Sequence, residues 1–220
     1  MSDLPNLAMR RWLIGIGASL VVIALLVILG RLAGWKALAT LAPDGVPTAF
    51  TTAVGFLMSG AALAAHGAGR RWRAQVAGGG TLLLGAGTLS LYAVAQMPAW
   101  QPFFHDATSP VVSAGAGFDA RMSPIVAGAF ALLGLALVCM GGRKPRAWLI
   151  LQGGAALMGL ALLTLSSYAA GLRTAQVWGR FSGLALPTVV GFLLAGGAVF
   201  FSALLSAPAP GKNPRRPLAY

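Results

Sequence analysis

Six long apolar stretches constrain the fold of this chain more than any other feature, because none carries a charged residue near its middle. Each has about the 20 residues that a helix needs to cross a bilayer. Since lipid offers the backbone no hydrogen-bond partners, each stretch predicts a transmembrane helix. The stretches cover about residues 12–33, 47–66, 75–97, 123–142, 147–170 and 187–206. The expected fold class is an all-α integral membrane protein with six transmembrane helices in one domain, residues 1–206.

The low charge content agrees with a membrane protein. Charged residues make up 9% of the 220-residue chain, whereas a soluble domain carries roughly 25%. The net charge is +12, from 16 basic and 4 acidic residues, and in a soluble protein this balance would indicate nucleic-acid binding. Here the basic residues cluster at the ends of the apolar stretches. We therefore expect contact with the lipid bilayer and its anionic head groups, and no nucleic acid.

The basic residues also predict the orientation of the helices. With a cytoplasmic N-terminus, eleven of the 16 basic residues fall on the cytoplasmic side, including those of the turns GRRWR and GRKPR. We expect a multi-pass membrane protein with both termini cytoplasmic. The uncharged run Trp12–Gly30 is longer than the apolar part of a signal peptide, so it is interpreted as a retained first span. Residues 207–220, rich in proline and charge, are expected to be a disordered cytoplasmic tail with no soluble domain after the last span.

The sequence also contains an internal repeat. Alignment on Phe130 brings residues 51–57 and 187–194 into register with the fourth apolar stretch. Residues 88–93 (TLSLYA) and 164–169 (TLSSYA) repeat near the ends of the third and fifth stretches. Three helical-hairpin units that point the same way are therefore predicted, with a pseudo-symmetry axis along the membrane normal. The units cover residues 10–67, 74–142 and 146–206.

The middle copy of the repeat, RMSPIVAGAFALLGLAL over residues 121–137, also carries a family resemblance. Its Met122, Pro124, Phe130 and the run 132–137 match the motif M-x-P-N-T-A-L-x-F-L-L-x-G-L-A-L, with Ile-Val in place of Asn-Thr. The chain thus resembles the six-span N-terminal membrane sensor region of bacterial PAS and sensor histidine kinases. The resemblance implies a sensor module of the bacterial inner membrane, here without the kinase part, so no kinase activity is carried over.

Hydroxyl-bearing and aromatic residues at the predicted outer ends of the helices form a candidate site. If three units pack around one axis, these residues would converge on a shallow outer pocket for a ligand. The alternative is that Pro124 and Pro187 simply start helices, since proline suits the first turn. The tyrosines would then anchor the helices at the interface, with Trp35 near the equivalent place in the first unit. The candidate ligand-binding residues are Thr51, Thr52, Tyr92, Ser123, Pro124, Tyr168 and Thr188.

No pattern in the sequence indicates an enzyme. Ionisable groups are missing from the middle of every span, which argues against proton-coupled transport and ion pumping. His66 and His105 fall on opposite predicted membrane faces, and the single cysteine, Cys139, excludes an intrachain disulfide or a cysteine metal cluster. We therefore expect no catalytic residues, no metal and no cofactor. Arg121 is expected to pair with Asp119 in the outer loop.

Two classes of function fit these features. The leading hypothesis is a non-enzymatic sensor-like or ligand-binding module in signal transduction, acting through a membrane or cytoplasmic protein partner. The alternative is a structural or accessory subunit of a larger membrane complex, with a small-solute transporter as a distant third. A common outer cavity lined by the hydroxyl groups would favour the first class, whereas hydroxyl groups facing lipid on separate sides would contradict it.

Overall fold

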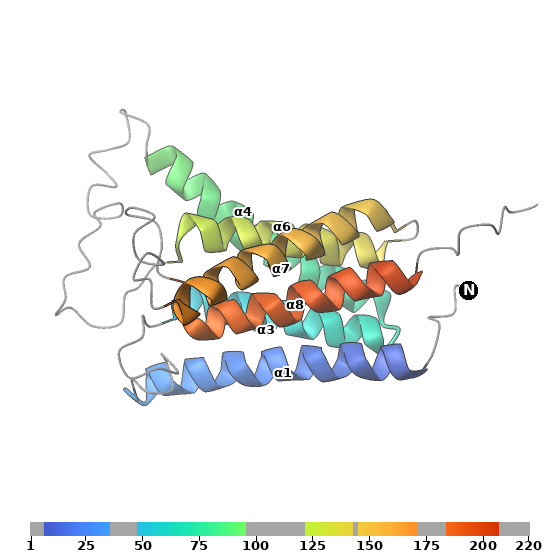
Figure 1. The fold of residues 1–220 in the computed structure, drawn as a ribbon, viewed down its shortest axis with the longest axis horizontal. Coiled ribbons are helices and arrows are strands. Elements are labelled where there is room, and N and C mark those ends of the chain that lie inside the picture. The colour runs from blue at the N-terminus through green and yellow to red at the C-terminus, as the bar shows by residue number, and fades with distance from the viewer. Residues whose placement is uncertain (1–6, 36–47, 96–121, 143–144, 171–183, 207–220) are drawn as a thin grey trace, which may run out of the picture.

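Six α-helices account for most of the described part of the chain (Figure 1). In the computed structural model, the described residues are 7–35, 48–95, 122–142, 145–170 and 184–206, and they contain no strand. Each helix is long and apolar enough to cross a membrane, as predicted. The helices are α1 (Leu7–Leu32), α3 (Phe50–Gly67), α4 (Arg71–Ala95), α6 (Pro124–Gly141), α7 (Ala147–Ala169) and α8 (Leu186–Ser206). Asp119, Arg121, His105 and the tail 207–220 lie outside the described residues.

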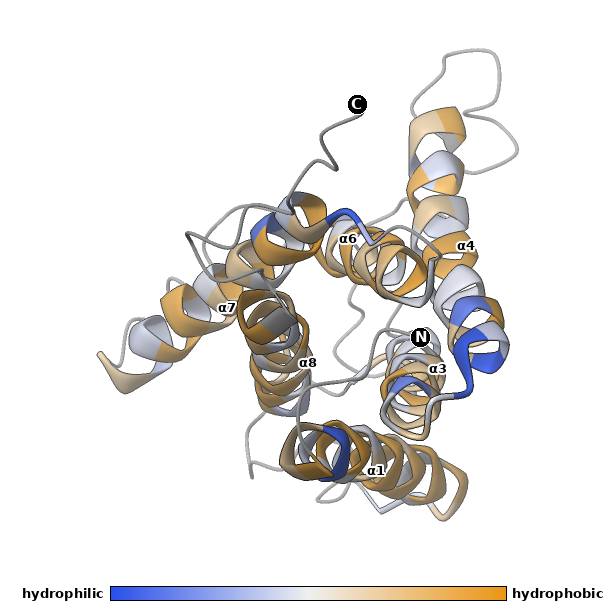
Figure 2. Cartoon of the chain, turned by 90° about the vertical axis from the view of Figure 1, so that its right-hand side faces the viewer, coloured by the Kyte–Doolittle hydropathy of each residue, from blue (hydrophilic) through white to orange (hydrophobic). Residues whose placement is uncertain are grey.

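The helices form an inner and an outer layer. Viewed along the bundle, α3, α6 and α8 surround the centre, and α1, α4 and α7 lie outside them (Figure 2). In the most apolar 18-residue window of each inner helix, 50%, 56% and 61% of the residues of α3, α6 and α8 are buried. The corresponding values for α1, α4 and α7 are 33%, 17% and 33%. The outer helices therefore turn most of their surface away from the bundle.

Each inner helix packs most extensively against one outer helix. The closest pairs are α1 with α3, α4 with α6, and α7 with α8. Smaller junctions join α3 to α4, α6 to α7, and α8 to α1, so inner and outer helices alternate around the bundle. The core where they meet consists of alanine, leucine, valine, methionine and phenylalanine side chains.

Glycines permit the close approach within these pairs. A Cβ at Gly60 would lie 2.6 Å from the carbonyl oxygen of Gly17 in α1. A Cβ at Gly196 would lie 2.9 Å from the Cβ of Leu157 in α7, and one at Gly134 would overlap the backbone of α4. In lipid no hydrophobic force draws helices together, so small residues that allow backbone contact provide much of the attraction.

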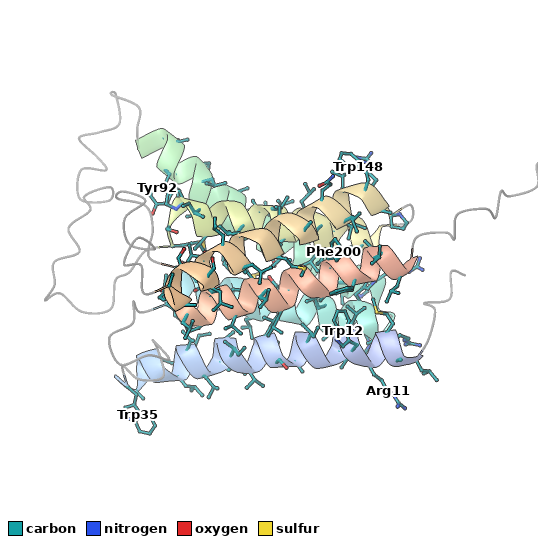
Figure 3. All side chains as sticks on the ribbon, in the orientation of Figure 1. Arg11, Trp12, Trp35, Tyr92, Trp148 and Phe200 are labelled. Atoms are coloured by element: carbon teal, nitrogen blue, oxygen red, sulfur yellow. The ribbon has the colours of Figure 1, made fainter. Side chains whose placement is uncertain are left out.

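The two ends of the bundle differ in composition. The arginine end holds the start of α1 with Arg10 and Arg11, the turn between α3 and α4, and the start of α7 with Trp148 (Figure 3). The tyrosine end holds Tyr92, Tyr168 and the starts of α3, α6 and α8. Hydrophilic residues of α1 and α4 gather at the arginine end (Figure 2).

The tight turn at the arginine end is built by local backbone chemistry. Gly69 has a φ of 75°, a left-handed conformation that glycine adopts without steric cost. The side-chain Nε of Arg10 in α1 donates a 2.9 Å hydrogen bond to the carbonyl oxygen of Gly67. Because the last carbonyls of a helix have no partner within it, this bond both caps α3 and ties it to α1.

Candidate functional site

Three phenylalanines meet at the centre of the bundle. Phe56, Phe130 and Phe192 come from α3, α6 and α8, and each is at most 2% exposed. Their ring centroids are 4.9, 5.1 and 4.9 Å apart, with interplanar angles of 66°, 59° and 55°. Such tilted and edge-on pairs are the geometry that aromatic rings prefer. The three residues are those that the sequence alignment places in register.

The same register continues from the phenylalanines toward the tyrosine end. Thr52, Val126 and Thr188 each lie four residues before their phenylalanine, which is about one helical turn. All three are buried, with 3%, 4% and 2% of their surface exposed. Four residues further lie Thr48, Met122 and Leu184, which are also buried. Two layers of mixed threonine and apolar side chains therefore cover the phenylalanine cluster on this side.

Two tyrosines link the outer helices to these layers. The hydroxyl of Tyr92 in α4 donates a 2.8 Å hydrogen bond to the carbonyl oxygen of Met122. The hydroxyl of Tyr168 in α7 donates a 2.6 Å bond to the carbonyl oxygen of Leu184. Met122 and Leu184 each lie eight residues before the phenylalanine of their own helix, so the two bonds occupy equivalent positions. We call each of these bonds a tyrosine link.

Close glycine contacts give the register of the outer helices. In each helix pair, one glycine of the outer helix lies against the backbone of the inner helix, eight residues after the central phenylalanine. A Cβ added to these three glycines would lie 2.7, 3.2 and 2.6 Å from the backbone nitrogen at that position. These glycines are Gly17, Gly78 and Gly154, and the nitrogens belong to Ala64, Val138 and Phe200. Tyr92 and Tyr168 both lie fourteen residues after their glycine, and in α1 that position is Arg31. Trp35, suggested by the sequence, is four residues beyond it.

The first pair, α1 with α3, therefore has no tyrosine at the linking position. Thr48 is the counterpart of Met122 and Leu184, and it is 2% exposed. Its hydroxyl is buried and has no hydrogen-bond partner among the described residues. An unsatisfied buried hydroxyl is destabilising by about 1–3 kcal/mol, which makes this group an exception that calls for an explanation. Sequence inspection missed Thr48, although extending the repeat alignment by three residues, from residue 51 back to residue 48, would have found it.

The candidate residues from the sequence fall into different environments. Ser123 caps α6, because its hydroxyl accepts a 3.3 Å hydrogen bond from the Val126 amide, and Pro124 occupies the first turn. Thr51 is exposed, whereas Thr52 and Thr188 are buried. Tyr92 and Tyr168 form the links described above. Ser123 and Pro124 thus have the helix-starting role considered for them, and the two buried threonines lie beside the central cluster.

Polar groups deeper in the bundle bond mainly to the backbone of their own helices. Ser59 donates to the Gly55 carbonyl at 2.7 Å, and Thr81 donates to the Ala77 carbonyl at 3.1 Å. The two hydroxyls lie 3.4 Å apart across the junction of α3 and α4. The described helices carry no carboxylate side chain, and no group of three potential metal ligands occurs within them. Among the described residues, hydroxyls, carbonyls and aromatic rings are therefore the groups that the tyrosine end offers to a ligand.

Comparison with known proteins gives no family assignment. No family model, curated protein or solved structure matches the chain.

Proposed function

We propose that this chain is a non-enzymatic sensor-like module, built from three helical-hairpin repeats, that responds to a small amphipathic ligand or to the state of the bilayer at its tyrosine end. In this proposal the arginine end faces the cytoplasm of a bacterium, where basic residues accumulate, and a protein partner carries the signal onward. The equivalent phenylalanine, glycine and tyrosine positions support the repeat. The resemblance of residues 121–137 to sensor-kinase membrane regions supports the class of function.

One observation carries the proposal, namely the incomplete set of tyrosine links. The second and third helix pairs each have one, while the first pair has a buried Thr48 hydroxyl without a partner. A pair without its link can separate at the tyrosine end at a lower energetic cost than the other two. Its unpaired hydroxyl gains a hydrogen bond when a polar group of a ligand or lipid enters. The first pair is therefore the element that an external molecule can displace.

A second candidate is an accessory subunit of a larger membrane complex, and α4 favours it. Leu83 and Trp72 of this helix are 74% and 68% exposed. A Cβ on Gly79 or Gly87 would meet no atom within 4 Å, so both glycines have open space around them. Small residues on an uncovered helix face allow another transmembrane helix to pack closely. On this alternative, α4 would be covered by a partner subunit in stoichiometric amount.

Distance measurements at both ends of the bundle test the leading proposal. Spin labels at Leu29 and Leu91, exposed residues of α1 and α4, report on the tyrosine end. Labels at Leu7 and Trp72 of the same helices report on the arginine end. The protein, with Cys139→Ala to remove the native thiol, is reconstituted in nanodiscs of short-chain and of long-chain phosphatidylcholine. We expect the Leu29–Leu91 distance to change by several ångströms between these bilayers while the Leu7–Trp72 distance stays constant.

The variant Thr48→Val connects this response to the proposed cause. Valine has nearly the shape of threonine without the unsatisfied hydroxyl, so the first pair should become more stable and the distance change should shrink. Thr51→Val, at an exposed position three residues away, is the matched control and should leave the response intact. Equal distance changes at both ends, or a response unaffected by Thr48→Val, would reject the proposal.

A further inference from the structure

A groove of about 530 Å³ lies at the arginine end, on the outside of the junction between α3 and α4. Alanines form most of its lining, which also includes Ile14 of α1 and two arginines. Along α3 it extends from Ala61 to Ala68, which is about 10 Å at 1.5 Å per residue. The groove is open to the surroundings of the bundle. The lining residues are Ile14, Ala61, Ala64, Ala65, Ala68, Arg70, Arg73 and Ala77.

The other two junctions explain why a groove exists here. At the junction of α8 and α1, Phe201 and Trp12 fill the equivalent space with an edge-to-face pair, 6.1 Å between centroids. Ala65 and Phe201 are counterparts, because each lies nine residues after the central phenylalanine of its helix. Arg73 and Trp12 are counterparts, because each lies five residues before the closely packed glycine of its helix. At the junction of α6 and α7 the same positions hold Cys139 and Leu149. The groove therefore lies where an aromatic pair packs at the junction of α8 and α1, with the small Ala65 in the position of Phe201.

The two arginines have no counterion within the described part of the chain. The described helices contain no aspartate or glutamate, and no hydrogen bond or ion pair joins the side chain of Arg70 or Arg73 to another described residue. Trp72, between them in sequence, is 68% exposed. Tryptophan concentrates at the level of the lipid head groups, so the arginines are expected at that depth. An apolar channel with two cations at the head-group level fits an amphipathic anion.

We propose that this groove binds one anionic phospholipid of the bilayer, with an acyl chain along the alanines and the phosphate on Arg70 and Arg73. Arginine pairs well with phosphate, because its planar guanidinium presents parallel N–H groups. The acyl chain takes the place that Phe201 and Trp12 occupy at the junction of α8 and α1. The lipid then joins α1, α3 and α4 at the arginine end, opposite the proposed sensing end, so this inference does not rest on the proposed function.

Native mass spectrometry of the purified protein tests the proposal. The probe is an equimolar mixture of phosphatidylglycerol and phosphatidylcholine added to dodecyl-maltoside micelles. We expect the intact protein to retain one phosphatidylglycerol in preference to phosphatidylcholine. Arg70→Gln combined with Arg73→Gln should reduce phosphatidylglycerol binding by about 25-fold, because one basic residue near anionic lipid contributes roughly fivefold. The single variant Ala65→Phe should reduce the binding of both lipids, because it fills the groove.

Two control variants separate this site from general effects of charge and bulk. Arg146 is the counterpart of Arg70 at the start of α7 and is exposed, so Arg146→Gln should leave lipid retention unchanged. Ala86→Phe adds the same bulk at an exposed position of α4 that does not line the groove. The proposal is overturned by equal retention of the two lipids, by an equal loss with Arg146→Gln, or by full retention with Ala65→Phe. A dimer that Ala65→Phe dissociates would instead assign the groove to a second copy of the chain.

Discussion

The three helix pairs resemble one another more closely at the centre of the bundle than at its tyrosine end. At the centre, three phenylalanines form a nearly equilateral triangle, with centroid distances between 4.9 and 5.1 Å. At the tyrosine end, two helix pairs have a tyrosine link, whereas the Thr48 hydroxyl of the first pair has no partner among the described residues. The three pairs are thus alike where their side chains must share one closed volume, and they differ where each pair ends separately.

Packing density explains this difference. Side chains in a closed core interdigitate, so a change of one member of the triangle requires a change of the other two. At the helix ends, a missing contact can be replaced by water, a lipid head group or a ligand, so one pair can diverge without affecting its neighbours. The comparison teaches that positions where one helix pair differs from the other two are the places to look for function in this molecule. Thr48 and the groove beside Arg73 are two such positions.

The largest effect is expected from truncating a phenylalanine of the central triangle. Phe130→Ala leaves a cavity at a fully buried position, and we expect a loss of about 3 kcal/mol in the free energy of unfolding. This is the lower end of the range for phenylalanine in soluble cores, because in a bilayer the separated helices remain in an apolar environment. Unfolding in mixed detergent micelles at increasing dodecyl sulfate measures the loss.

The near-equilateral arrangement of the three rings also predicts equal effects for the other two phenylalanines. Phe56→Ala and Phe192→Ala should each cost the same as Phe130→Ala within about 1 kcal/mol, since all three rings are buried alike. Phe50→Ala, at a side chain 48% exposed at the start of α3, is the control and should cost far less. If one of the three phenylalanines dominates, the centre is not equivalent among the pairs and the comparison fails.

Effects of intermediate size are expected at two neighbouring glycines of α8, where alanine should destabilise the protein at one position and stabilise it at the other. A Cβ at Gly196 would lie 2.9 Å from the Leu157 Cβ and 3.0 Å from the Met158 amide nitrogen. Backbone cannot move aside locally, so Gly196→Ala should separate α7 from α8 and destabilise the protein by about 1–3 kcal/mol. A Cβ at Gly197 meets nothing within 4 Å. Gly197→Ala should therefore stabilise the helix by up to about 1 kcal/mol, measured by the same unfolding assay.

Much of the fold could be predicted from the sequence, because its determinants are local or repeated. Apolar length predicts six helices, and the structure has them. Alignment on Phe130 predicts which residues are equivalent, and the rings of Phe56, Phe130 and Phe192 do meet. The helix-starting role of Ser123 with Pro124 also follows from residue type and spacing, and the hydrogen bond of Ser123 to the Val126 amide agrees with it.

The candidate site was less accessible to sequence reasoning, because it depends on which residues face each other across helices. Thr51 and Thr52 are adjacent in sequence, yet the first is exposed and the second is buried. The register of α1 against α3 depends on the close approach of Gly17 to Ala64. The residue types at these positions do not predict this contact. The groove is harder still, since it results from small side chains at Ala65 where the equivalent junction holds Phe201.

The smallest effect is expected at the tyrosine links, and it bears most directly on the comparison. Tyr92→Phe and Tyr168→Phe each keep the ring and remove the hydroxyl that donates to the carbonyl of Met122 or Leu184, just before α6 or α8. Each should cost about 0.6 kcal/mol, the average for hydrogen bonds between transmembrane helices. Ser166→Ala is the control, because its hydroxyl bonds within its own helix to the Leu163 carbonyl. Unfolding free energies of the single and double variants measure these costs.

The double variant and a gain-of-link variant decide whether the links act independently. The tyrosines belong to separate helix pairs and donate to the carbonyls of different residues, Met122 and Leu184, so the costs of the two variants should add. Arg31→Tyr supplies a tyrosine at the equivalent position of α1, fourteen residues after Gly17. If the first pair differs from the others simply by lacking this residue, Arg31→Tyr should return about the same 0.6 kcal/mol. A loss of stability instead would mean that the first pair has a different geometry at this end, and the absent link would then reflect its backbone rather than one substitution.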